Sequence, residues 1–257
     1  MPESWWRRFR SYFTAQPLPD SLWQRALAAC PLALRLDGAR QDELRRLVAV
    51  FLARKRFHAL AGAELTEHLR ILIAMQACLP ALQQGPRALR GWREVLVYPG
   101  EFKVHRSHHD ERSGIVSEGE DVLIGEAWEH GPLVLSLADV QLDLEHPWDG
   151  YNVVVHEIAH KLDMLDGPPD GVPPLPAHMV RRQWIVAFQR AFDHLANDVA
   201  RGRETLIDAY AAEGADEFFA VVSELHWSQP AVLRRADASV ADLLDAYYGP
   251  SPAPGHT

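Results

Sequence analysis

The sequence has few cysteines, no long apolar run and no excess of positive charge. Only Cys30 and Cys78 carry thiols among 257 residues, so a fold built on disulfide bonds is excluded. Neither belongs to a C-x-x-C pair, which argues against a thiolate metal site. Both lie among apolar neighbours, and we expect buried thiols in a reducing, cytoplasmic setting.

The balance of charge and the spacing of apolar residues exclude two classes of partner. Asp and Glu total 35 against 26 Lys and Arg, a formal charge of -9, whereas a nucleic-acid surface requires the opposite sign. We therefore expect no direct contact with nucleic acid. The longest apolar stretch, residues 71–82, is broken by Gln76 and Pro80 and falls short of the roughly 20 residues that a membrane helix needs. No apolar segment follows Arg7 and Arg8, so we expect neither an export signal nor a membrane anchor.

The composition is that of a globular protein, with 47% hydrophobic and 24% charged residues. We expect a single domain over residues 1–248, with a helical N-terminal part (1–90) and a second part (91–248) that holds the sheet and the metal-site helices. Residues 249–257 are rich in proline and glycine, which predicts a flexible tail.

Hydrophobic periodicity predicts an α+β fold. Residues 20–82 follow helical spacing, with Thr66 as the N-cap of one helix. Several short strands in succession favour a small mixed or antiparallel sheet. We expect strands at 95–98, 122–124 and 133–137, and further helices at 152–165, 177–200, 215–227 and 236–247.

The segment 151–163 contains the pattern His-Glu-x-x-His. On a helix, His156 and His160 share one face and can reach the same metal ion. Glu157 is one step round the helix, where it can act as general base toward a metal-bound water. The alternative is a helix whose two histidines form hydrogen bonds inside the core.

Two histidines leave a catalytic zinc short of protein ligands, since three are usual. No His-x-x-Gly-x-x-His extension follows His160, which excludes the metzincin arrangement. Glu217 and Glu224 are seven residues apart on one face of a strongly apolar helix, where carboxylates are rarely buried without a partner. Either could be a metal ligand, or could cap a helix or pair with an arginine.

The run from Asn152 to Gly167 and the run from Asp208 to Glu224 resemble the signature of the Mlc titration factor A family of bacterial zinc peptidases. The resemblance extends from about Leu44 to Pro230 through the segments 51–57, 73–79 and 131–136.

This resemblance implies a zincin-like fold, related to the catalytic domain of anthrax lethal factor, and a gluzincin-type site with one Zn²⁺ per chain. It assigns His156, His160 and Glu217 as zinc ligands and Glu157 as the base. Tyr210 matches the family tyrosine that faces the zinc and can stabilise an oxyanion.

The resemblance also implies a peptide substrate and aminopeptidase activity. One family member binds the glucose repressor Mlc, so a transcription repressor of sugar uptake is a candidate partner. The competing hypothesis is a regulatory, partner-binding protein with a weak or dormant zinc site. The intact Glu157 and Tyr210 favour catalysis, because a pure binding module needs neither.

Three features remain open. Asp163, three residues after His160, could orient a ligand imidazole or could cap the helix in solvent. Glu224 could support the metal site from outside the ligand set. The cluster His105, His108 and His109 could be a second metal site, although its spacing favours a solvated loop.

Overall fold

The computed structural model describes residues 15–100 and 131–253. Short helices and two strands form the N-terminal part: α2 (Asp20–Ala28), α3 (Pro31–Leu34), α4 (Gly38–Arg54), β1 (Arg56–Ala59), α5 (Glu67–Cys78), η1 (Gly85–Arg87) and β2 (Glu94–Tyr98). One strand and a series of helices form the C-terminal part: β3 (Leu133–Ser136), α6 (Leu137–Glu145), α7 (Val153–Asp163), α8 (Arg181–Ala200), η3 (Ala209–Ala212), α9 (Ala215–Ser228), α10 (Pro230–Ala236) and α11 (Ala238–Tyr248).

The three described strands form one parallel sheet in the order β1-β2-β3, with Val95 of β2 paired to Phe57 on one side and Leu133 on the other. The helix-rich chain with a small sheet agrees with the expected α+β class. The expectation of a mixed or antiparallel sheet was wrong for these strands. Parallel neighbours need a long crossover, and α5 provides it between β1 and β2. The strand expected at 122–124 lies outside the described residues.

Strand β1 lies inside the stretch 20–82, for which helical spacing predicts helices alone. Its four residues alternate polar and apolar side chains, but the run has the minimum length at which alternation indicates a strand, and three of the four residues are exposed. By contrast, β2 alternates half-buried and buried positions and was predicted at its observed place.

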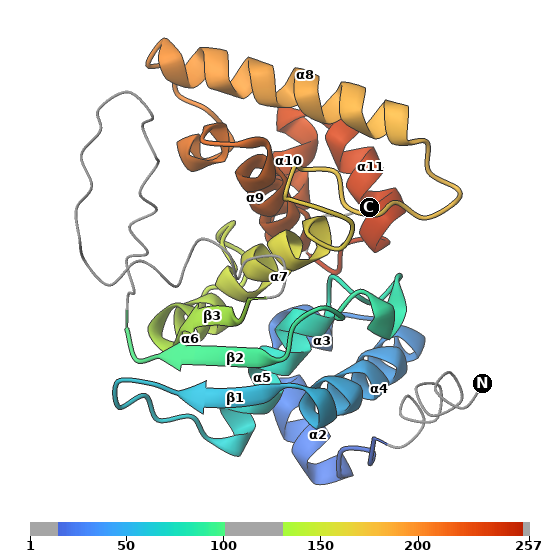
Figure 1. The fold of residues 1–257 in the computed structure, drawn as a ribbon, viewed down its shortest axis with the longest axis vertical. Helices are drawn as coiled ribbons and strands as arrows, with labels where there is room; N and C mark the ends of the chain where they lie inside the picture. The colour runs from blue at the N-terminus through green and yellow to red at the C-terminus, as the bar shows by residue number, and fades with distance from the viewer. Residues whose placement is uncertain (1–14, 101–130, 254–257) are drawn as a thin grey trace.

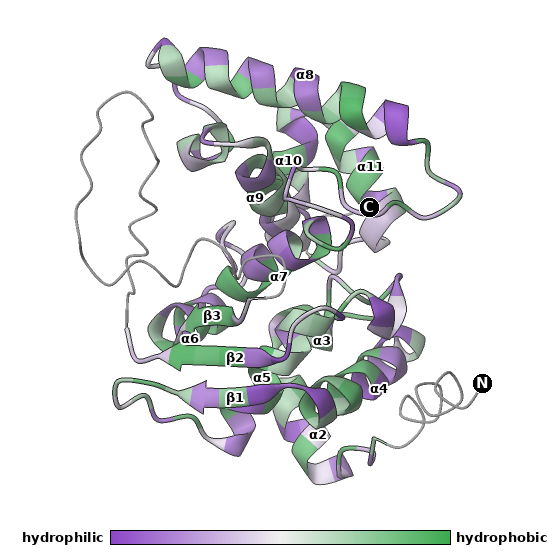
Figure 2. Ribbon diagram, viewed as in Figure 1, coloured by the Kyte–Doolittle hydropathy of each residue, from purple (hydrophilic) through white to green (hydrophobic). Residues whose placement is uncertain are grey.

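Figure 1 shows the sheet and helices α2–α5 in one half of the molecule and helices α8–α11 in the other, with α7 between them. Apolar side chains from both halves belong to one buried core. Figure 2 shows β3 and most of β2 as hydrophobic, and Val95, Val97 and Leu133 are fully buried. Helix α7 therefore lies in the middle of the core.

Helix ends follow capping chemistry. Thr66 caps α5 as predicted, since its hydroxyl accepts the N–H of Leu69. Ser136 ends β3 one residue earlier than expected, because its hydroxyl accepts the N–H of Asp139 and starts α6, a helix that the sequence did not predict. Helix α10 was also missed. Among the described helices, none combines the length and apolar character needed to cross a bilayer.

Helix α9 is the central helix of the C-terminal half. Every residue from Glu217 to Ser228 is buried. Rings from α8 and α11 surround it: Trp184 stacks on Phe188 with centroids 4.1 Å apart, and Phe219 of α9 packs edge-on to Trp184 at 5.8 Å. This packing fixes the position of any polar side chain that α9 directs inward.

The C-terminal segment packs against the N-terminal helices as far as it is described. The carbonyls of Pro250 and Pro252 accept hydrogen bonds from Arg40 and Arg35, and Ala253 is buried. The tail expected to be flexible from residue 249 is therefore held down through residue 253, and residues 254–257 lie outside the described part.

Candidate metal centre

Helix α7 begins at Val153 because the residues around its N-terminus satisfy the free backbone N–H groups. The side chain of Asn152 accepts the N–H of Val155 at 2.9 Å. Asp143 of α6 accepts the N–H of Val153 at 2.7 Å, and Glu224 of α9 accepts the N–H of Asn152 at 2.6 Å. The start of α7 is thus fixed from two other helices.

His156 and His160 on α7 meet Glu217 on α9. One carboxylate oxygen of Glu217 lies 3.2 Å from Nε2 of His156 and 3.4 Å from Nε2 of His160, and the two Nε2 atoms are 3.2 Å apart. His160 and Glu217 are buried and His156 is half-buried. Within the described residues, this is the group of histidine, cysteine and acidic side chains whose donor atoms converge closely enough for a metal ion.

The donor set and its dimensions fit a small tetrahedral cation. Donor atoms 2.0–2.1 Å from a tetrahedral Zn²⁺ lie about 3.3 Å from one another. The three distances between the donor atoms of His156, His160 and Glu217 agree with this value. Two imidazoles and one carboxylate, with a further position left open, is the ligand set of hydrolytic zinc sites.

Glu224 sets the orientation of His156. Its second oxygen lies 2.7 Å from Nδ1 of His156. Because an ionised carboxylate only accepts, Nδ1 is the donor, and Nε2 of the neutral ring keeps its lone pair for a ligand role. Glu224 thereby binds both the residue before α7 and the first histidine of the motif.

The same network reaches the N-terminal half. The amide of Asn152 donates to Gln76 of α5 at 2.7 Å, and both side chains are buried. Burial raises the pKa of Asp143 to about 7, an effect that the N–H of Val153 opposes and Glu224 adds to. No role at the site is predicted from sequence for Asn152, Gln76 or Asp143. An asparagine before a helical run is a recognisable capping signal, but Gln76 and Asp143 have no signal outside the tertiary structure.

Glu157 follows His156 on α7 and is half-buried. Its charge interacts with Lys161, one turn further along, and partly opposes the lowering of the Lys161 pKa by burial. The ammonium of Lys161 donates to the carbonyl of Gly131, two residues before β3, at 3.0 Å. The helix that carries the motif is therefore tied to the start of β3.

Tyr210 lies on the short helix η3, which precedes α9. Its ring centroid is 6.1 Å from that of His156, and the ring is 36% exposed. The structure thus brings Tyr210 beside the three converging side chains, although it comes from a different element. The cluster His105, His108 and His109 lies outside the described residues.

Asp163 does not cap the helix in solvent, and its hydrogen bond goes to a loop rather than to a ligand imidazole. It is buried at the end of α7, and its carboxylate accepts the N–H of Gly171 at 2.7 Å. Gly171 has a φ of +77°, and a Cβ there would lie 2.6 Å from the carbonyl oxygen of Ala215. Asp163 thus holds a loop against the first residue of α9, two residues before Glu217.

Burial predicts a pH-dependent effect of Asp163 on stability. Desolvation raises the pKa of Asp163 to about 7, whereas that of an unfolded aspartate is about 4. Between these values the folded chain binds a proton that the unfolded chain does not, so the wild type loses stability as the pH rises. Asp163→Asn keeps an oxygen for Gly171 but does not titrate. We expect the free energy of unfolding of Asp163→Asn, relative to that of the wild type, to rise by on the order of 2 kcal/mol from pH 4.5 to pH 7.5.

Urea unfolding of the two metal-free proteins, in the presence of a chelator and at both pH values, measures this difference. Asp42→Asn, at an exposed position of α4, is the control. A difference between Asp163→Asn and the wild type that is equal at both pH values would contradict a protonated, buried Asp163.

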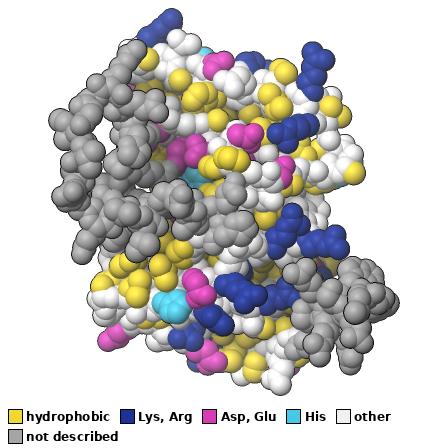
Figure 3. Space-filling model, viewed as in Figure 1, with side chains coloured by type: hydrophobic (Ala, Val, Ile, Leu, Met, Phe, Trp, Pro, Cys, Tyr) yellow, Lys and Arg dark blue, Asp and Glu magenta, His cyan; other side chains and the backbone are white. Residues whose placement is uncertain are grey.

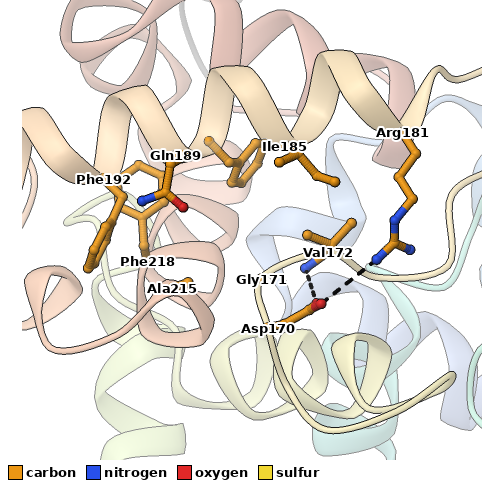
Figure 4. Close-up of a pocket in the computed structure, with 10 residues that line it drawn as sticks. Asp170, Gly171, Val172, Arg181, Ile185, Gln189, Phe192, Ala215 and Phe218 are labelled. Carbon is orange, nitrogen blue, oxygen red and sulfur yellow. Dashed lines mark hydrogen bonds and ion pairs between the residues drawn. The ribbon is translucent and has the colours of Figure 1, made fainter.

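The 170–172 loop also forms one side of a pocket of about 210 Å³ against α8. Figure 4 shows Asp170 at its edge, joined to the N–H of Val172 and facing Arg181. The ten residues that line this pocket do not include His156, His160 or Glu217. It is therefore separate from the candidate metal centre.

Comparisons with known proteins agree with this site. A family model for the glucose-regulated metallo-peptidase M90 matches residues 3–249. Mlc titration factor A of Klebsiella pneumoniae is 39% identical over 211 residues, which cover 81% of this chain and 78% of the relative. The protein of the same name in Cronobacter sakazakii is 36% identical over 238 residues, 92% and 87% of the two chains. An uncharacterized Synechocystis protein is 34% identical over 236 residues, 91% and 85%. The chain therefore belongs to the glucose-regulated metallo-peptidase M90 family and is related to the Mlc titration factor A proteins.

Proposed function

We propose that the protein is a zinc-dependent aminopeptidase whose metal ligands are His156, His160 and Glu217. The observation that supports this best is the convergence of their three donor atoms within 3.4 Å, next to Glu157 on the same helix. Membership of a metallopeptidase family agrees with it. When bound, zinc would polarise the peptide carbonyl and make water acidic enough to attack it near neutral pH.

The protein's own residues supply the proton transfers and the charge stabilisation. Glu157 accepts a proton from the attacking water and delivers it to the leaving amine. The phenol of Tyr210, beside His156, donates a hydrogen bond to the oxyanion that develops on the peptide carbonyl. Glu224 keeps His156 in the tautomer that a metal ligand requires.

Strand β3 offers a place for the peptide backbone. It pairs with β2 along one edge, and none of the other described strands pairs with its second edge. The bond from Lys161 to Gly131 ties β3 to the helix that carries Glu157. An extended peptide that pairs with this edge would be recognised mainly through its main chain, which implies broad side-chain specificity.

The charge distribution supports recognition of a free amino terminus. Acidic residues outnumber basic ones more than twofold in residues 131–253, whereas basic residues prevail in residues 15–100. Figure 3 shows Lys and Arg side chains gathered across the lower half of one face, which is the N-terminal half. The half that contributes the metal ligands is therefore negative overall, and a negative field favours the α-ammonium group of a peptide.

Hydrolysis of aminoacyl p-nitroanilides, with and without chelator, tests the proposal. We expect activity that chelation abolishes and that added Zn²⁺ restores. The matched substrate is the same anilide with an acetylated amino group, which an aminopeptidase should leave intact. Equal hydrolysis of both substrates would indicate an endopeptidase, and no hydrolysis of either would favour the regulatory alternative.

The names of the relatives support a second candidate function. Mlc titration factor A proteins are named for their effect on Mlc, and we propose that this chain too binds a repressor of that kind. A cytoplasmic location belongs to this proposal, in accord with the two buried, unpaired thiols. Binding of purified repressor by a variant without peptidase activity would show that the two functions are separate.

Tyr210→Phe separates a role in catalysis from a role in packing. The substitution removes one hydroxyl and leaves the ring beside His156. Loss of one oxyanion donor costs about 10²–10³-fold in kcat, and we expect a fall of that order with KM nearly unchanged and zinc retained. Steady-state kinetics give kcat and KM for this variant, and metal analysis shows whether it retains zinc. An unaltered kcat would leave Tyr210 as a packing residue.

A further inference from the structure

We propose that Asp208 is a positioning residue that holds Tyr210 beside His156, by fastening the turn that carries Tyr210 to Tyr151, two residues before α7. This role of Asp208 rests on the proposed function of Tyr210 as oxyanion donor. It concerns a carboxylate outside the group of metal-binding donors.

The two oxygens of Asp208 bind two different segments. Oδ1 accepts the backbone N–H of Tyr210 at 2.8 Å and so caps η3. Oδ2 accepts the hydroxyl of Tyr151 at 2.8 Å, across 57 residues of sequence. Tyr151 immediately precedes Asn152, whose backbone and side chain fix the start of α7. One carboxylate thus joins the tyrosine turn to the metal-binding helix.

Burial alone does not fix this region. Tyr151 is 55% exposed, Tyr210 is 36% exposed, and Asp208 is exposed as well. Helix η3 has only four residues, and a 3₁₀ turn of that length is weakly stable by itself. The buried Ile207 and Ala211 anchor this segment to the core, and the hydrogen bonds of Asp208 fix the exposed turn between them that carries Tyr210.

The electrostatics of Tyr151 reflect its bond to Asp208. The pKa of Tyr151 is raised, chiefly because its hydroxyl donates to Asp208, with burial as the next cause. Asp149 also contacts Tyr151, but through the backbone N–H at 3.0 Å and on the same loop. Of these two carboxylates, Asp208 is the one that connects Tyr151 with the turn of Tyr210.

Positioning of this kind predicts a specific pattern in the kinetics. Displacement of a catalytic group by about 1 Å can lower turnover by up to about 10²-fold. We expect Asp208→Ala to lower kcat about 10–100-fold, with KM and zinc content nearly unchanged. Tyr151→Phe, which cuts only the link to α7, should have a smaller effect. Asp208→Asn should restore most of the activity, because its carboxamide can accept from Tyr210 and donate to Tyr151.

A double-mutant cycle with Tyr210→Phe is the decisive experiment. If Asp208 acts through Tyr210, then Asp208→Ala has little further effect on kcat when the phenol is already missing. Asp37→Ala is the control, since Asp37 caps α4 through the N–H of Arg40 in the other half of the molecule. It should lose helix-capping stability but keep kcat.

Several outcomes would overturn the inference. These are an equal loss of kcat with and without the Tyr210 phenol, a loss of zinc in Asp208→Ala, or an Asp208→Asn variant whose kcat is as low as that of Asp208→Ala.

Hydrogen exchange of the Tyr210 amide gives a second readout that needs no activity. The amide should exchange faster in Asp208→Ala than in the wild type, and the asparagine variant should restore its protection. If the wild type hydrolyses no peptide but this exchange pattern holds, the proposed function fails while the anchoring role stands; unchanged exchange refutes the anchoring.

Discussion

Glu157→Gln is expected to abolish peptidase activity while the zinc stays bound. The amide has the size of the carboxylate but cannot accept the proton of the attacking water at neutral pH. Loss of a general base lowers turnover by about 10²–10⁴-fold, and we expect kcat to fall in this range. Glu157 is not among the three converging donors, so metal content by elemental analysis should stay near one ion per chain.

The measurement must separate this role from a structural one. The charge of Glu157 also interacts with Lys161, and a carboxylate that served only this pair would affect stability rather than kcat. Thermal unfolding of Glu157→Gln should stay close to that of the wild type. Glu64→Gln, an exposed position in the other half, controls for the change of charge. Full turnover in Glu157→Gln would remove Glu157 from the mechanism.

The parts of the site that could be predicted from sequence are those set by local geometry. The pairing of His156 and His160 follows from helical periodicity alone, and in the structure their Nε2 atoms are 3.2 Å apart. The assignment of Glu217 as a ligand comes from the resemblance, because periodicity places Glu217 and Glu224 on the same helix face. Packing of α7 on α9 distinguishes the two: Glu217 faces both Nε2 atoms, whereas Glu224 binds Nδ1 of His156 and the N–H of Asn152.

The parts that could not be predicted depend on contacts between distant segments. Strand β1 has only four residues, three of them exposed, and the parallel order of the sheet follows from where α5 crosses it, which no local pattern reveals. Asp163 was considered beside a ligand because of its place after His160, yet it binds the N–H of Gly171. Asp208 accepts a local hydrogen bond that sequence can predict for an aspartate before a turn, but its bond to Tyr151 spans 57 residues.

These long-range contacts explain how the site is kept in place. The start of α7 is bound by Glu224 from α9 and Asp143 from α6, and Asn152 links it to Gln76 of α5. The end of α7 is bound by a loop that touches Ala215 of α9. Both ends of α7, which carries the histidines, are therefore held in position relative to α9, which carries Glu217.

Glu217→Ala and Glu224→Ala form a matched pair that tests the division of roles on α9. Both remove the same atoms from the same buried helix, seven residues apart. Loss of Glu217 removes a metal donor, and we expect zinc affinity to fall by more than about 100-fold. Loss of Glu224 leaves the three donors but releases His156, and changes of such supporting residues cost about 10–100-fold in metal affinity. Competition with a chromophoric chelator gives both dissociation constants.

Without metal, we expect Glu224→Ala to lower the free energy of unfolding more than Glu217→Ala does. In the chelated protein, Glu224→Ala leaves the buried N–H of Asn152 and Nδ1 of His156 without their acceptor. Each buried donor left unsatisfied costs about 1–3 kcal/mol, so we expect the larger loss of unfolding free energy at Glu224. Glu217→Ala should instead lose most of the additional stability that zinc gives the wild type, because stabilisation by a ligand follows its affinity for the folded state. A zinc affinity lower in Glu224→Ala than in Glu217→Ala would reverse the assignment and make Glu224 the third metal ligand.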